Sequence, residues 1–460
     1  MLPFADAASE RLPLSRLLRL SLFQVSVGMA LVLLTGALNR VLIVELGAPA
    51  SLVAIMIALP VCFAPLRALI GHRSDTHHSV LGWKRGPFIW FGSLLQFGGL
   101  AILPFSLMVL SGDGVGPIWA GQAAAALAFL MVGAGLHTTQ TAGLALATDI
   151  APEATRPRVV ALLYVMLLAG MAASGIVFGF LLADFSPLRL IQVIQGAAVV
   201  TVALNLAALW RQETRNPDRL APPPETKSFR ESWRGFTKTP GATRLLVAVA
   251  LGAAAFGMQD VLLEPYGGEV LLLSVAETTR LTALFAVGAI AGFGLAARRL
   301  TRGAEPHRLA AHGALVGVFA FTAVIFSAPL TAPALFQAGV FLIGFGGGLF
   351  SVCTLTALMA LARPGEAGVA VGAWGAAQAT AAGAAIALGG ALRDAVSAVA
   401  LSGAFGPAFA TPAAGYGFVY HIEIALLFAT VIAIGPLARH RHTPPTDEES
   451  RFGIAAFPNS

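Results

Sequence analysis

Charged residues are scarce in this chain. Only 11% of its 460 residues are Asp, Glu, Lys or Arg, whereas 57% are hydrophobic. Soluble domains carry about 25% charged residues, so a water-exposed surface could not be covered by so few. The scarcity excludes an ordinary soluble globular protein and indicates that most of the chain lies in lipid.

Cysteine and the common catalytic motifs are also scarce or missing. Cys62 and Cys353 are the only cysteines, and both lie in apolar segments, which favours buried reduced thiols over a disulfide. The sequence has no Walker loop, CxxC pair, HExxH zinc motif or nucleophile elbow. We therefore expect no enzyme activity and no bound metal.

Long apolar runs recur along the chain. Runs of about 20 apolar residues are long enough to cross a membrane as helices. Strand-like alternation is missing, while Ala, Leu and Gly dominate, so helices rather than a closed barrel are predicted. The twelve candidate spans are 20–44, 50–70, 87–110, 117–147, 158–183, 188–210, 243–264, 276–297, 309–328, 333–362, 367–391 and 415–438. The sequence predicts an all-α polytopic membrane protein.

Positive charge is distributed unevenly between the predicted loops. With both termini placed in the cytoplasm, 25 of the 29 Lys and Arg residues fall at the inner side; Arg40, Arg189, Arg280 and Arg393 fall at the outer side. An excess of Lys and Arg in cytoplasmic loops sets the orientation of membrane proteins. The same excess explains the basic character of the chain, so no nucleic-acid partner is expected.

A charged, proline-rich connector divides the chain into six spans plus six. We predict an N-terminal six-helix bundle (1–210), a cytoplasmic linker (211–242), a C-terminal six-helix bundle (243–438) and a flexible cytoplasmic tail (439–460). ATDIAPEATRPRVVALLY (147–164) follows the fourth span, and the weakly similar ALARPGEAGVAVGAWG (360–375) follows the tenth. A parallel repeat of two six-helix bundles is the architecture of major facilitator transporters.

The loop between the second and third spans supports this fold. It contains Gly71, Asp75, Lys84 and Arg85, which is similar to the facilitator loop motif of Gly, three residues, Asp and then basic residues. The loop departs from the motif at Thr76, where a basic residue is usual, and in its long spacing to Lys84. With twelve spans and a central linker, the motif favours a major-facilitator-like architecture.

Polar residues occur near the predicted outer ends of the first and seventh spans. Charged groups in a span are costly, so they indicate a functional site. In a facilitator-like fold these two helices face each other across the central cavity. We therefore expect Arg40 to pair with Asp260 or Glu264, either lining the cavity or closing its outer mouth. The candidate cavity and gate residues are Asn39, Arg40, Gln259, Asp260, Glu264 and Tyr266.

Three other spans carry candidate ligand-binding residues. Trp374 and Gln378 lie four residues apart in the glycine-rich eleventh span and share one face. That face suits either tight packing against the other half or contact with a flat ligand. His137 and Gln140 lie in the fourth span and His421 in the twelfth. A neutral histidine is a common metal ligand, although hydrogen bonding within the bundle is the alternative.

The most distinctive segments resemble one family. GMQDVLLEPYGGEVL (257–271), GAWGAAQATAAGAAIALGGALRD (372–394) and the outward Asn39–Arg40 pair are similar to the PucC/LhaA family, the bacteriochlorophyll-delivery family of the major facilitator superfamily. The resemblance extends from the first span to YGFVYHIEIALLFATV (416–431) in the last. The overall length favours the PucC branch.

The resemblance implies a membrane assembly factor for photosynthetic light-harvesting antennae. Such a protein would bind or deliver bacteriochlorophyll to antenna polypeptides, with the peripheral antenna favoured over the core antenna. It would lie in the inner, intracytoplasmic photosynthetic membrane, with lipid, pigment and antenna polypeptides as partners. The candidate pigment-contacting residues are then His137, Gln140, Trp374, Gln378 and His421. Whether pigment is transported or only held stays open.

A conventional transporter is the alternative. A proton-coupled secondary transporter of a small solute would use Asp260 or Glu264 as its proton carrier, because coupled porters place carboxylates near the cavity. The charged residues within the spans are few and cluster toward the outer ends, which favours the assembly factor. A scaffold that contacts antenna polypeptides without pigment is a third possibility.

Overall fold

The computed structural model describes residues 12–63, 70, 74, 83–112, 114–152, 155–213, 239–361 and 367–439, and these are helical along most of their length. Eleven of the described helices are long and apolar enough to cross a membrane. The predicted second span begins with the shorter apolar helix Ala50–Val61 and leaves the described residues after Phe63. The predicted all-α polytopic fold is therefore confirmed.

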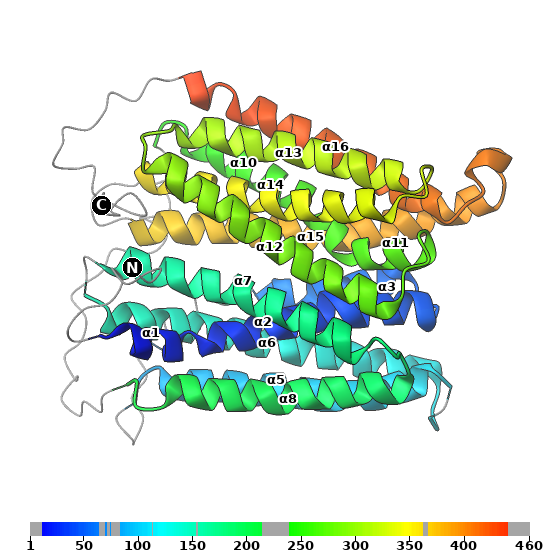
Figure 1. Ribbon diagram of the computed structural model, residues 1–460, viewed down its shortest axis with the longest axis horizontal. Helices are drawn as coiled ribbons and strands as arrows, with labels where there is room; N and C mark the ends of the chain where they lie inside the picture. The colour runs from blue at the N-terminus through cyan, green and yellow to red at the C-terminus, as the bar shows by residue number, and fades with distance from the viewer. Residues whose placement is uncertain are drawn as a thin grey trace.

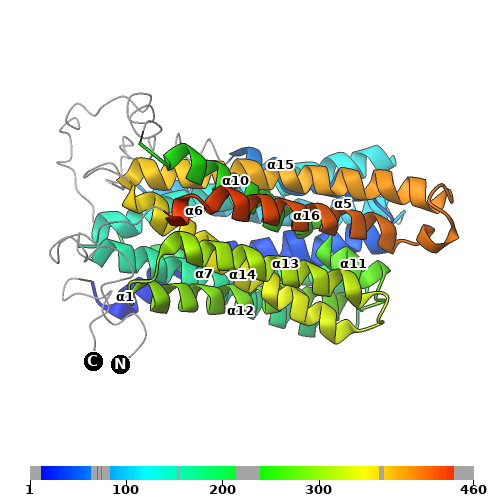
Figure 2. The same cartoon turned by 90° about the horizontal axis from the view of Figure 1, so that it is seen from above.

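The two halves of the chain form two groups of helices (Figure 1). The first half, mainly in the lower part of Figure 1, comprises α1 (Leu14–Leu20), α2 (Leu22–Leu31), α3 (Ala50–Ala58), α5 (Gly86–Leu110), α6 (Ile118–Ile150), α7 (Arg156–Leu181) and α8 (Pro187–Leu209). The second half comprises α10 (Ala242–Gly257), α11 (Leu263–Glu269), α12 (Val275–Leu300), α13 (Pro306–Ser327), α14 (Pro333–Ala360), α15 (Ala367–Leu401) and α16 (Ala413–Ile434). Seen from above, α10, α15 and α16 lie beside one another (Figure 2). The predicted linker and tail lie largely outside the described residues.

The first span is longer than predicted and irregular. It runs from Leu14 to Glu45, so it begins six residues before the predicted start and includes Arg16 and Arg19. After α2 the chain forms two π-helical segments, Val32–Leu38 and Val41–Glu45. Wider π-helical turns often occur at functional sites because they change the direction in which the following side chains point. Asn39 and Arg40 lie between these two segments.

Close backbone contacts between glycine-bearing helices hold each half together. A Cβ atom at Gly288 of α12 would lie 2.1 Å from the carbonyl oxygen of Phe341 on α14, and one at Gly344 of α14 would lie 2.1 Å from the carbonyl oxygen of Phe285. In lipid, helices associate through van der Waals packing and close approach rather than through the hydrophobic effect. The high glycine content therefore supports packing inside the protein.

A buried polar network ties the first half together. Ser26 of α2 donates to the side-chain oxygen of Asn205 on α8 at 2.7 Å, and the Asn205 amide donates to the Ser93 hydroxyl on α5 at 2.8 Å. All three side chains are buried. Since lipid offers no hydrogen-bond partner, this chain of bonds fixes the rotation of the three helices.

The halves meet where α3 packs on α15 and where α7 packs on α12. A Cβ atom at Gly390 of α15 would lie 2.4 Å from the Cβ of Ala54, and one at Gly175 of α7 would lie 2.9 Å from Ala283 of α12. In Figure 1, α12 slants toward the first half as it approaches the right-hand end. We call this the outer end, following the predicted orientation, because Arg40 and Arg393 lie there.

The eleventh span continues beyond its predicted end. The predicted span ends at residue 391, before Arg393 and Asp394. Instead α15 runs to Leu401, so both charged residues lie within the helix. Their partners in neighbouring helices, described below, allow the helix to continue through a charged position.

The glycine contacts predict a position-specific effect on stability. We expect Gly288→Ala to lower the free energy of unfolding by about 1–3 kcal/mol, because the new methyl group forces α12 and α14 apart. Gly294→Ala, on the same helix, is the matched control because nothing lies within 4 Å of its added Cβ. Thermal melting in detergent measures both. Equal melting temperatures for the two variants would contradict the packing role.

Candidate functional site

The seventh span is discontinuous where its polar residues lie. Helix α10 ends at Gly257, a 3₁₀ turn follows at Met258–Val261, and α11 continues the span to Glu269. Gln259 and Asp260 lie in the 3₁₀ turn. Interrupted helices expose backbone groups and are typical of binding sites in transporter folds. The break therefore marks the centre of the candidate site.

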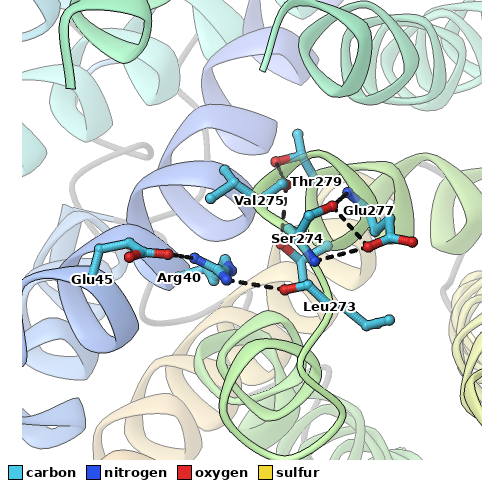
Figure 3. A network of polar contacts seen from close by, with 8 residues as sticks. Arg40, Glu45, Leu273, Ser274, Val275, Glu277 and Thr279 are labelled. Atoms are coloured by element: carbon cyan, nitrogen blue, oxygen red, sulfur yellow. Dashed lines mark hydrogen bonds and ion pairs between the residues drawn. The ribbon is translucent and has the colours of Figure 1, made fainter. Parts of the chain in front are cut away.

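Arg40 does not form the predicted pair with Asp260 or Glu264, and that prediction is wrong. Its guanidinium group forms an ion pair with Glu45 of the same span and donates to the carbonyl oxygen of Leu273 at 3.0 Å (Figure 3). The π-helical segment Val41–Glu45 brings Glu45 within reach five residues later. Arg40 thus links the first half to the connection between α11 and α12.

A helix cap fixes the acceptor that Arg40 uses. The Ser274 hydroxyl accepts from the backbone N–H of Glu277, and the Glu277 carboxylate accepts from the backbone N–H of Ser274 at 2.8 Å (Figure 3). Such a capping box satisfies two backbone donors at the start of a helix. It holds the residue before it, Leu273, with its carbonyl toward Arg40. One residue before Arg40, the Asn39 amide donates to the backbone oxygen of Asp260 at 3.5 Å.

The polar groups of the seventh span are buried inside the protein. Gln259 is 2% exposed and Glu264 is 5% exposed. Gln259 donates to the carboxylate of Asp260, and Glu264 accepts from the hydroxyl of Thr282 on α12 at 3.0 Å. The sequence predicts these residues near the outer end of the span, where α11 lies (Figure 1), and the structure shows that they are also packed inside the second half. Carboxyl groups in such a place are costly and indicate function.

Glu423 of α16 is a site residue that the sequence analysis did not select. It is fully buried, and α16 contacts the 3₁₀ turn of the seventh span. Asp260 lies close enough to interact with it electrostatically. A glutamate within the apolar run 413–434 was the available signal, because burial of such a residue is costly without a role.

Tyr266 lies in a buried aromatic cluster. Its ring centroid is 5.4 Å from that of Phe336 and 5.5 Å from those of Tyr416 and Tyr420. Its hydroxyl donates to the carbonyl oxygen of Val324 at 3.1 Å. Tyr266 therefore anchors α11 against α13, α14 and α16 from inside the second half.

A second polar network joins the halves at the outer end. Arg393 of α15 forms an ion pair with Glu269 of α11, and the Tyr416 hydroxyl donates to Glu269 at 2.9 Å. The carboxylate of the next residue, Asp394, accepts from the first two backbone N–H groups of α3, at 3.3 and 2.7 Å. A carboxylate at this position satisfies free donors and complements the helix dipole. With Arg40, this network closes the outer end.

Four of the five predicted ligand-contacting residues are buried or partly buried. Gln140 donates to the side-chain oxygen of Gln24 at 3.3 Å, and Trp374 donates to the hydroxyl of Thr354 at 3.2 Å. The first bond joins α6 to α2 in the first half, and the second joins α15 to α14 in the second half. His137 and Gln378 are partly buried.

His421 differs from the other four because its side chain is exposed on α16. Its Nδ1 lies 2.6 Å from the carbonyl oxygen of Gly417, one turn earlier. A carbonyl only accepts, so Nδ1 carries the proton and, in the neutral ring, Nε2 keeps its lone pair. Phe418 and Phe428 on the same helix are 46% and 50% exposed. His421 thus presents a metal-ligating nitrogen on an apolar, lipid-facing surface.

The structure describes only part of the loop motif between the second and third spans. Of its predicted residues, Gly71 and Asp75 lie outside the described residues, while Lys84 and Arg85 precede α5. Arg85 forms an ion pair with Asp149 at the end of α6, at 3.0 Å, and hydrogen-bonds to Ser74. Glu213, which follows α8, accepts from the backbone N–H groups of residues 84, 85 and 86. These contacts join the inner ends of three helices.

A cavity of about 400 Å³ lies between α2, α7 and α8. Its walls are mostly apolar and include Val177, Gly196 and Val200, with Arg189 and Gln192 as polar members. Val177 and Val200 are 51% and 45% exposed, so the cavity opens to the surface that faces lipid. An added Cβ at Gly196 would meet nothing within 4 Å. We call this the α7–α8 groove.

Comparison with known proteins gives consistent matches. A family model described as "PUCC protein" matches residues 37–442. The chain is 57% identical over 465 residues to "Uncharacterized protein in puhA-bchM intergenic region" of Rhodobacter capsulatus, covering 99% of this chain and 97% of that protein. It is 58% identical over 402 residues to "Protein PucC" of Rhodovulum sulfidophilum, covering 86% and 88%.

More distant matches concern a pigment-related protein and the fold. The chain is 31% identical over 380 residues to "Bacteriochlorophyll synthase 44.5 kDa chain" of Rhodobacter capsulatus, covering 80% and 85%. Among solved structures, an inward-facing bacterial homologue of the lysosomal transporter Spinster superposes with a TM-score of 0.70 at 14% identity, covering 95% and 98%. That likeness shows a major-facilitator-like fold.

The outer network predicts a stability effect of one carboxylate. We expect Asp394→Ala to lower the free energy of unfolding by about 1–2 kcal/mol, because the first N–H groups of α3 lose their acceptor. Asp184→Ala is the control, since Asp184 is exposed in the nearby connection between α7 and α8. Thermal melting in detergent checks the prediction. A loss no larger than that of the control would show that Asp394 does not hold the two halves together.

Proposed function

The chain belongs to the PUCC protein family, and we propose that it is a membrane assembly factor for photosynthetic light-harvesting antennae that binds bacteriochlorophyll and delivers it to antenna polypeptides. Its relatives from purple bacteria support a role in photosynthetic pigment and complex biology. Three of them carry the name PucC at 53–58% identity, and we propose the peripheral antenna as the one served.

The observation that carries pigment binding is the geometry of His421. Magnesium in a chlorin ring accepts an axial ligand, and a metal-ligating histidine usually donates its other ring N–H to a backbone carbonyl or carboxylate. The bond from Nδ1 to the Gly417 oxygen meets that requirement. Nothing lies within 4 Å of an added Cβ at Gly417, so the surface beside the histidine has room for a flat ring. Phe418 and Phe428 extend this apolar surface along the helix.

The α7–α8 groove is the proposed contact for an antenna polypeptide. Antenna subunits are single-span helices, and such a helix approaches closely only where small residues replace large ones. Gly196, Ala173 and Ala197 provide small residues along the groove. His421 lies on α16, in the other half of the chain. We propose that pigment and polypeptide bind at separate lipid-facing sites.

The placement of the protein follows from the same proposal. A multi-pass protein of this kind would lie in the inner, intracytoplasmic photosynthetic membrane, with both termini in the cytoplasm. On this proposal the chain catalyses no reaction. Its structural likeness to solved transporters makes proton-coupled transport of a small solute the second candidate. Substrate-dependent proton movement in vesicles would identify that function, whereas an assembly factor should produce none.

Pigment binding is tested by the absorption spectrum of the protein purified from a pigment-producing host. We expect a near-infrared bacteriochlorophyll band at fixed stoichiometry, and we expect His421→Leu to reduce it by at least about tenfold, equivalent to about 1.4 kcal/mol. His312→Leu, at another exposed histidine, should leave the band unchanged. A colourless wild-type protein that is well folded would overturn pigment binding. An unchanged band in His421→Leu would move the site elsewhere, with His137 and Gln378 variants next.

Antenna contact is tested by co-purification of antenna polypeptides with the tagged protein. We expect Gly196→Leu to reduce the recovered antenna polypeptide several-fold, because the larger side chain fills the α7–α8 groove. Gly294→Leu is the matched control, since an added Cβ there also meets nothing. Recovery that is equal in both variants would count against the groove. Melting temperatures near the wild-type value in both variants would exclude misfolding as the cause.

A further inference from the structure

Three acidic side chains, two of them buried and Asp260 partly buried, gather in the second half of the protein. Asp260 lies in the 3₁₀ turn of the seventh span, Glu264 in α11 and Glu423 in α16. Asp260 lies near enough to both glutamates to interact with each electrostatically. Glu264 is 5% exposed and Glu423 is fully buried. We call these residues the carboxylate triad.

The cationic groups near the triad are all engaged elsewhere. Arg40 pairs with Glu45, Arg393 pairs with Glu269 and Asp394, and Arg280 lies over the ring of Phe180. Within the described ranges, none of the recorded ion pairs involves a member of the triad. Three negative charges in a packed, lipid-embedded interior would therefore repel one another without compensation.

Unpartnered buried polar atoms point to the ligand. No side-chain donor reaches either carboxyl oxygen of Glu423, and the Tyr420 hydroxyl and the side-chain oxygen of Asn39 lack a hydrogen-bond partner. Tyr420 lies near Glu264 and Glu423, and the Asn39 amide reaches the backbone oxygen of Asp260. A carboxylate only accepts hydrogen bonds, whereas a protonated carboxyl group also donates one. A protonated carboxyl group of the triad can therefore donate a hydrogen bond to a neighbouring oxygen, such as that of Asn39 or Tyr420.

A metal ion is a poorer candidate for this position. In the part of the chain that the structure describes, no group of three or more His, Cys, Asp or Glu side chains could hold a metal ion. Toward the outer end, the titratable or charged side chains on the elements packed around the triad are Arg40, Glu45, Tyr266, Glu269, Glu277, Arg280, Arg393, Asp394, Tyr416 and Tyr420. At the opposite ends of α10, α12 and α13 the same elements carry Arg244, Arg298, Arg299, His307, Arg308 and His312. His421 shares α16 with Glu423, but its exposed ring is bonded to Gly417 and faces away.

We propose that the carboxylate triad is a proton-binding site whose protonation stabilises the closed outer end. Glu264 and Glu269, a member of the outer network, lie on the same seven-residue helix, α11. Glu423 and Tyr416, which donates to Glu269, both lie on α16. Repulsion between deprotonated triad members pushes α11 and α16 apart, and this movement separates Glu269 from Tyr416 and Arg393 within the second half. Arg393 also pairs with Asp394, which holds α3 of the first half, so the same movement loosens the contact between the halves. Low pH therefore favours the closed outer end and high pH favours its opening.

The first test is infrared spectroscopy of the full-length, pigment-free protein in lipid nanodiscs. The carbonyl stretch of protonated carboxyl groups should be present in the wild type and should fade as the pH rises between about pH 5 and about pH 9. The signal should be smaller in Glu423→Gln and in Glu264→Gln. Asp184→Asn, which changes an exposed outer carboxylate, should leave it unchanged. A wild-type protein without this signal at low pH would overturn the site.

The second test measures the outer end directly. Spin labels at Ser111 and Ser402, which are exposed outside α5 and α15 respectively, report the separation of the halves after Cys62 and Cys353 are replaced. We expect the distance distribution to lengthen with rising pH in the wild type. The double variant Glu264→Gln with Glu423→Gln should keep the short distance at high pH.

Two outcomes of the second test would overturn the proposal. One is an unchanged pH profile in the double variant. The other is a separation that follows the sodium concentration at constant pH, which would assign the site to sodium. Both tests use pigment-free protein, so their failure leaves the proposed antenna role untouched, and failure of pigment binding leaves the proton site untouched.

Discussion

Lipid cannot hydrogen-bond to a protein, and the rest of this structure depends on that constraint. Every polar group within a span must find a partner inside the protein or remain at high cost. In the first half, Ser26, Asn205 and Ser93 meet the constraint by bonding to one another. Glycine positions such as Gly28 on α2 and Gly92 on α5 bring the first-half helices close enough for this packing. These contacts hold the helices of the first half together.

Among the described residues, the second half differs because it buries the carboxyl groups of Glu264 and Glu423, and this difference matters for function. Glu264 has one hydroxyl partner, but the carboxyl oxygens of Glu423 have none. The broken seventh span lies beside these groups, where an interruption of the helix is tolerated because protein rather than lipid surrounds it. The aromatic cluster around Tyr266 holds α11 against its neighbours. The buried carboxyl groups of Glu264 and Glu423 thus lie on the same two helices, α11 and α16, as Glu269 and Tyr416 of the outer network.

The lipid-facing surface has a different character from the interior. His421 exposes a ring nitrogen among phenylalanines, and the α7–α8 groove opens between apolar side chains. A transporter presents its binding groups to a central, water-filled cavity. An assembly factor must instead meet hydrophobic partners from the side, within the membrane. The positions of His421 and the groove suit lateral encounter, while the fold itself is shared with transporters.

The sequence by itself determined the membrane class, the positions of nearly all spans and the family. These follow from apolar run length and from local motifs, which act over neighbouring residues and need no knowledge of the fold. It also showed that Arg40, Asp260 and Glu264 required an explanation, because their cost in a span is independent of the fold. Only the tertiary structure decided their partners. The π-helical turns beside Arg40 and the 3₁₀ turn at Asp260 change side-chain direction, and spacing along a regular helix cannot anticipate that. The role of Glu423 also required the structure, since α16 meets the seventh span about 160 residues away in the chain.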